Sequence, residues 1–109
     1  MNRRRSSRVP VYLAFDVYLR HAHLGRFWTQ NVSQEGLFLG TSSLGQLAGG
    51  VLDLLFHADG SEHRLRGIAV HQTPGKGVGV QIAYWRKDDR LAHQAYLSII
   101  GSISHRRAA

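Results

Sequence analysis

Residues 78–103, VGVQIAYWRKDDRLAHQAYLSIIGSI, contain the change of hydrophobic period that decides the fold class. Over residues 78–84 apolar side chains alternate with small or polar ones, which is the period-2 pattern of a β-strand. Asp88 and Asp89 then stand where acidic side chains favour the start of a helix. Apolar side chains follow at helical spacing: Ala92, Tyr96, Ile99 and Ile103, with Leu91, Ala95 and Ile100 beside them. The stretch predicts a last strand and then one amphipathic helix over residues 86–104.

Gly101 is a position at which the predicted helix could end early, and the tail from His105 is expected to be frayed. Upstream, apolar alternation and turn composition predict five more strands, at residues 11–19, 26–30, 37–39, 51–56 and 64–72. Turns or loops are expected at 21–25, 31–36, 40–50, 58–61 and 73–77. The alternation slips phase near Gly67, which indicates a β-bulge there.

Six short strands followed by one helix predict an all-β fold with a terminal helix. The expected architecture is a six-stranded antiparallel β-barrel capped by the C-terminal α-helix. No linker divides the 109 residues, so we expect a single domain over residues 1–109. Within it we expect a mobile basic arm at residues 1–10, the barrel at 11–85 and the helix at 86–104.

Charge indicates the kind of partner. The chain has 14 Lys and Arg against 7 Asp and Glu, a formal net charge of +7, and four arginines fall within residues 3–8. This excess favours an anionic partner: a nucleic acid, an acidic membrane surface or a phosphate-bearing small molecule. The absence of cysteine excludes a disulfide scaffold and a Cys-based metal site. No apolar run suits a membrane span or a secretory signal, so no membrane insertion and a cytoplasmic location are expected.

Two short motifs carry the functional prediction. Arg4-x-x-x-Arg8 precedes the first strand, and Asn31-x-Ser33-x-x-Gly36 occupies the expected turn between the second and third strands. Together, in this order, they resemble the two-part signature of the PilZ family, whose fold is a six-stranded barrel with a C-terminal helix. The resemblance covers essentially the whole chain. It implies a cyclic di-GMP receptor that performs no chemistry of its own and signals through a protein partner, which the sequence does not identify.

The resemblance gives the arginines a role in ligand binding. Arg4 and Arg8 would bind phosphate oxygens or guanine edges bidentately and stack on the purine face. Arg3 would help to hold a second, stacked nucleotide, so two ligands per chain are expected. We expect the arginine segment to be mobile without ligand and to order over the bound nucleotide.

The resemblance also assigns roles to the turn motif. Asn31 and Ser33 would hydrogen-bond a guanine edge, although Asn31 offers one carbonyl oxygen where an Asp would offer two acceptors. Gly36 would allow close backbone approach or positive φ. His71, near the end of the fifth predicted strand, is a further candidate that could face the same site and stack on guanine.

Other interpretations remain open at this point. The basic arm could bind nucleic acid electrostatically, or the chain could be a PilZ-like scaffold without nucleotide binding. The seven histidines, with only His21 and His23 close together, are better explained as surface residues than as metal ligands. Trp28, Trp85 and the tyrosines could form a base-stacking platform, but we expect them in the barrel interior and the helix contact. No pair of carboxylates, activated nucleophile or cofactor motif indicates an enzyme.

Overall fold

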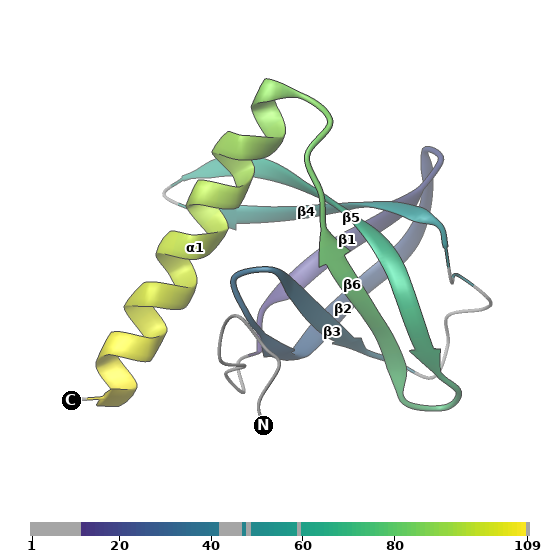
Figure 1. Ribbon diagram of the computed structural model, residues 1–109, viewed down its shortest axis with the longest axis horizontal. Helices are drawn as coiled ribbons and strands as arrows, with labels where there is room; N and C mark the ends of the chain where they lie inside the picture. Colours follow the sequence, from purple (N-terminus) through teal and green to yellow (C-terminus); the bar gives the residue numbers. More distant parts are fainter. Residues whose placement is uncertain (1–11, 42–46, 48, 59, 109) are drawn as a thin grey trace.

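A computed structural model describes residues 12–41, 47, 49–58 and 60–108, with side chains up to Ser102 in the helix. Six antiparallel strands form a closed barrel in the order β1-β2-β3-β6-β5-β4, and one helix follows them (Figure 1). The elements are β1 (Ala14–Leu19), β2 (Ala22–Val32), β3 (Gly36–Gly40), β4 (Val51–Ala58), β5 (Ser61–Thr73), β6 (Gly77–Ile82) and α1 (Lys87–Ala108). The predicted fold class is therefore confirmed.

The hairpin between β1 and β2 differs from the prediction. The turn expected at residues 21–25 is wrong, because β2 already begins at Ala22 and pairs with Leu19. The connection is the two-residue turn Arg20–His21, with φ of 51° and 71°. Two positive φ values give the turn a twist that matches the flanking strands. Arg and His are not the residues that usually signal such a turn, so the sequence pattern gave no indication of it.

The helix packs one side against the barrel. Ala92, Tyr96 and Ile100, spaced four residues apart, are buried in the same core as the strand side chains. Leu91, which was expected beside this stripe, is 61% exposed. The helix does not end early at Gly101 but continues past the predicted end at residue 104 to Ala108, and its C-terminal end reaches beyond the barrel (Figure 1). Within the described part of the chain, no helix is long and apolar enough to cross a bilayer.

The described barrel has three register shifts, and two of them, both β-bulges, decide that Asn31 and His71 face outward. The pairing register shifts between Thr29 and Asn31 on β2, and between Ala69 and His71 on β5. Because each bulge inserts one extra residue, the alternation changes phase there. Thr29 and Ala69 are fully buried, and without the bulges Asn31 and His71 would point inward like them. The bulge predicted near Gly67 therefore lies three residues further on, at Val70.

Gly36 and Gly101 make a matched pair for a stability test. A Cβ at Gly36 would lie 2.5 Å from the Val80 carbonyl oxygen, whereas one at Gly101 would meet no heavy atom within 4 Å. We expect Gly36→Ala to lower the free energy of unfolding by about 1–3 kcal/mol, because the paired strands must move apart. Gly101→Ala should raise it by about 1 kcal/mol through helix propensity. Urea unfolding followed by circular dichroism checks both, and an equally stable Gly36→Ala variant would contradict the close approach.

Candidate functional site

One row of residues crosses the outer face of four neighbouring strands. Asn31 on β2 pairs with Phe38 on β3, Phe38 pairs with Gly79 on β6, and Gly79 pairs with His71 on β5. Three strand spacings make this row about 14 Å long. We call it the Asn31–His71 row. The barrel thus brings two of the predicted site residues, far apart in the sequence, onto one face.

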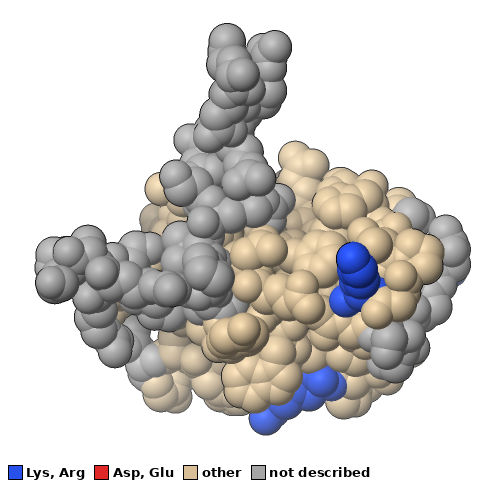
Figure 2. All heavy atoms as spheres, turned by 90° about the horizontal axis from the view of Figure 1, so that it is seen from below, with Lys and Arg blue, Asp and Glu red and all other residues tan. Residues whose placement is uncertain are grey.

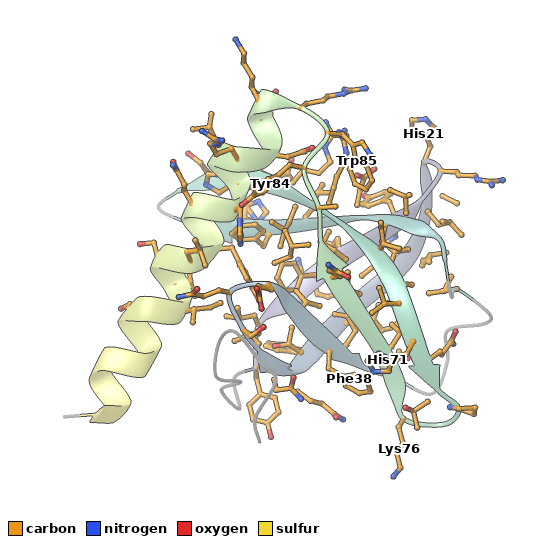
Figure 3. All side chains as sticks on the ribbon, in the orientation of Figure 1. His21, Phe38, His71, Lys76, Tyr84 and Trp85 are labelled. Atoms are coloured by element: carbon orange, nitrogen blue, oxygen red, sulfur yellow. The ribbon has the colours of Figure 1, made fainter. Side chains whose placement is uncertain are left out.

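Two aromatic rings form the middle of this row. The Phe38 and His71 rings are stacked, with centroids 6.0 Å apart and an interplanar angle of 27°. Figure 3 shows them side by side at the lower end of the barrel. A Cβ at Gly79 would overlap the His71 ring, and one at Gly77 would lie 2.7 Å from the Phe38 ring. The glycines of β6 therefore let both rings lie low against the sheet, as a surface on which a flat ring can stack.

The motif residues Ser33 and Gly36 are used within their own turn. Ser33 is buried, and its backbone amide and hydroxyl both donate to the Gly36 carbonyl, at 2.8 Å and 3.3 Å. Gly36 is required by its close approach to the Val80 carbonyl and has no positive φ. Asn31, predicted in the turn, lies at the end of β2, half-buried on the outer face. Of the three motif residues, it is the one that the bulge presents outward.

The helix and the segment before it hold this turn in place. The hydroxyl of the fully buried Tyr96 lies 2.8 Å and 3.0 Å from the carbonyl oxygens of Ser33 and Gly36. A ring nitrogen of His93 lies 2.6 Å from the carbonyl oxygen of Gln34. The carbonyl oxygen of Glu35 accepts a hydrogen bond of 2.9 Å from the amide of Ile82. All four carbonyls of residues 33–36 are thus bound, so the shape of the turn depends on the position of α1.

The predicted site residues Arg3, Arg4 and Arg8 lie outside the described residues. The described chain starts at Tyr12, and Leu13 is joined to Thr29 by two hydrogen bonds of 2.8 Å and 2.9 Å. The chain therefore enters β1 beside the part of β2 that leads to Asn31. Four residues span at most about 14 Å, which limits how far the α-carbon of Arg8 can lie from that of Tyr12.

Among the described residues, no carboxylate is in view at the end of the barrel with the aromatic rings (Figure 2). Figure 2 views the molecule from below, where Figure 3 places Phe38, His71 and Lys76. Basic side chains and no acidic ones are in view among its coloured residues.

Asp16 lies on the outer face of β1, where it pairs with two residues of β2: His23, 3.1 Å away, and Arg26. The hydrogen bond from His23, and then that from Arg26, lowers the pKa of Asp16.

A separate groove of about 610 Å³ lies near the start of α1, lined by residues of β1, β4, β5 and the helix and of the segments beside them. None of the predicted site residues lines it. Its charges are mixed, with Arg64, Arg66 and Arg86 beside Asp53 and Asp88 among others. Mixed charge does not select for a phosphate ligand, so we place the candidate site on the Asn31–His71 row. Among the described residues, no cluster of His, Cys, Asp or Glu could hold a metal ion.

The tryptophans differ from the prediction, and one aromatic residue was missed. Trp28 and Trp85 are 56% and 52% exposed, so placing them in the interior was wrong. Phe38 was missed as a site residue because it stood in a short apolar run with the buried Leu37 and Leu39. Strict alternation within that run would have placed Phe38 on the opposite face.

The solved structures that are similar to this one include a PilZ domain and an inhibitor of motility. The PilZ domain of CeSA from a cellulose-synthesizing bacterium matches with a TM-score of 0.71 and 14% identity, over 88% of this chain and 99% of that one. The Bacillus subtilis inhibitor of motility, MotI/DgrA, matches with a TM-score of 0.62 and 14% identity, over 93% of this chain. The match covers 53% of the MotI/DgrA chain, so this protein spans about half its length. No family model and no curated protein sequence matches the chain. The two likenesses confirm a PilZ-like fold.

Proposed function

We propose that this chain, with its PilZ-like domain, is a receptor for cyclic di-GMP that signals through a protein partner. The observation that carries the proposal is the Asn31–His71 row, which places a motif residue beside two stacked rings. The N-terminal segment with Arg4 and Arg8 enters the barrel beside the same part of β2. Anion binding, a polar contact for a base edge and a stacking surface would then meet on one face.

The ligand has two phosphates and two guanines, and the proposed face offers a contact for each. The Asn31 amide suits one guanine edge, and the rings of Phe38 and His71 suit a purine face. Arg4 and Arg8 would bind the phosphates, since a guanidinium matches two phosphate oxygens at once. Ser33 and Gly36 would act indirectly, because their hydrogen bonds and close packing set the position of Asn31.

The helix gives a route from ligand to partner. Tyr96 and His93 contact the carbonyls of the motif turn, so a ligand that moves the turn would also move α1. Ordering of the arginine segment over the ligand would change the same side of the molecule. We propose that the partner recognises this combined surface and that the chain itself catalyses no reaction.

Isothermal titration calorimetry with cyclic di-GMP tests the proposal, with GTP as the control ligand. We expect saturable binding of cyclic di-GMP and none of GTP at tens of micromolar. Two nucleotides per chain in the wild type and one in Arg3→Ala would support the role given to Arg3. If cyclic di-GMP produces no heat of binding at these concentrations, the receptor function is refuted. A PilZ-like scaffold without nucleotide binding would then be the better interpretation.

Single-stranded nucleic acid is the second candidate ligand, because exposed aromatic rings in a chain of net charge +7 are also suited to stacked bases. Its affinity should fall steeply with salt and depend little on the base. Titrating a labelled oligonucleotide at low and moderate salt, with cyclic di-GMP as competitor, separates the two. Guanine-specific binding that survives moderate salt would favour the receptor.

A further inference from the structure

Trp28 is a large apolar side chain that the fold leaves exposed on the face of the proposed site. It is 56% exposed, while its neighbour Thr29 is fully buried, so Trp28 points away from the barrel interior. The bulge at Gln30 then places Asn31 on the same outer face as Trp28. Trp28 is therefore the outward residue that precedes Asn31 and the bulge on β2.

The strands beside Trp28 carry little side-chain bulk. Its Cα partners are Ala14 on β1 and Gly40 on β3, and Gly40 in turn pairs with Gly77 on β6. A Cβ at Gly40 would lie 2.7 Å from the Gln30 side chain, so that side chain lies low across the glycine. The Trp28 ring thus borders a shallow area with a polar amide at its floor.

On the far side of this area is the Asn31–His71 row. Phe38 lies two residues from Gly40 on β3, which makes it the diagonal cross-strand neighbour of Trp28. Diagonal neighbours on one face of a sheet are about 7–8 Å apart, within reach of aromatic side chains. A purine bound against Phe38 therefore lies within reach of the Trp28 ring.

We infer that Trp28 is a second base-stacking residue of the proposed site, in contact with a guanine of the bound cyclic dinucleotide. This inference rests on the proposed function. The guanine lies between Trp28 and the Phe38–His71 rings, with Asn31 and Gln30 at its polar edge. The indole contributes affinity by stacking, which is tolerant of base identity, and the amides supply the preference for guanine.

The chain offers its own control, because Trp85 is exposed to nearly the same extent, at 52%. Figure 3 shows Trp85 in the connection before α1, at the opposite end of the barrel from Phe38 and His71. Trp85→Phe leaves Trp28 as the single tryptophan, and Trp28→Phe leaves Trp85. Cyclic di-GMP is titrated into each protein while the indole fluorescence is measured, with GTP at equal absorbance as the inner-filter control.

In Trp85→Phe, we expect cyclic di-GMP to quench the Trp28 fluorescence saturably, at the same midpoint concentration as calorimetric binding. In Trp28→Phe, we expect no quenching of the Trp85 fluorescence. Trp28→Ala should weaken binding by about 5- to 150-fold, the range for loss of one stacked base, whereas Trp85→Ala should leave it unchanged. If the wild type binds but Trp28 fluorescence and Trp28→Ala affinity stay unchanged, the inference is overturned and the receptor function stands. If the wild type does not bind, the proposed function fails and the inference fails with it. Far-ultraviolet circular dichroism verifies that each variant is folded.

Discussion

Replacing Arg4 or Arg8 by alanine is expected to weaken the binding of cyclic di-GMP by about 100-fold or more. A hydrogen bond to a charged group contributes about 1.5–3 kcal/mol, and a guanidinium can make two such bonds to one phosphate. Loss of about 3 kcal/mol corresponds to about a 150-fold change in the dissociation constant. Calorimetric titration of each variant with cyclic di-GMP measures the effect directly.

Arg64 provides a control with the same change of net charge. It is an exposed residue of β5 that lines the separate groove, and no ion pair of Arg64 is found among the described residues. Seven residues of strand, about 23 Å, separate it from His71. Arg64→Ala, like Arg106→Ala in the C-terminal segment, should leave affinity unchanged. Equal losses in all four variants would show that general positive charge, and not the motif, attracts the ligand.

Replacing either motif arginine by lysine separates the effect of positive charge from the effect of the shape of the guanidinium. Arg4→Lys and Arg8→Lys keep the positive charge but lose the planar fork and the surface that stacks on a purine. We expect most of the alanine effect to remain in these variants. Full affinity in the lysine variants would mean that the arginines act as point charges, as they would in the nucleic-acid alternative.

The barrel and its helix could be predicted because local patterns repeat along the chain. The buried residues of β4 follow the period of two, and Ala92, Tyr96 and Ile100 follow the helical period. The bulges at Gln30 and Val70 could not be predicted in the same way. A bulge is set by how two strands pair across the sheet, and no residue type at either position marks it.

The same reasoning explains what was and was not predicted at the site. Asn31 and Gly36 were predicted as site residues because the motif has a fixed spacing, but their structural environment depends on partners far along the chain. Gly36 is needed because Val80 approaches it, and the turn is held by Tyr96, 60 residues away from Gly36. Such contacts exist only after the barrel has closed. Sequence spacing can therefore single out candidate residues without showing which contacts they make in the fold.

Asp89 is the residue that fixes the start of α1 to the barrel. Its side chain is 4% exposed and lies 3.5 Å from the Arg66 guanidinium, which also pairs with Asp53 at 3.0 Å. It accepts hydrogen bonds from the backbone amides of Trp85 and Arg86, at 2.7 Å and 2.9 Å. One carboxylate thus binds two amides of the connection before the helix and joins the helix to β5.

Asp89→Ala is expected to lower the free energy of unfolding by about 3–5 kcal/mol, because two backbone amides each lose a hydrogen bond to a charged group, about 1.5–3 kcal/mol apiece, and Arg66 loses one of its two partners. The neighbouring Asp88 is exposed, so Asp88→Ala should cost only the helix-dipole interaction, about 0.3–1 kcal/mol. Urea unfolding of both variants measures the difference. Similar losses would show that Asp89 acts only through the dipole and that its contact with Arg66 adds little. A large loss in Asp89→Ala alone would place the main attachment of α1 at its first turn. Because Tyr96 on the same helix holds the motif turn, that attachment would also determine how firmly the binding face is presented.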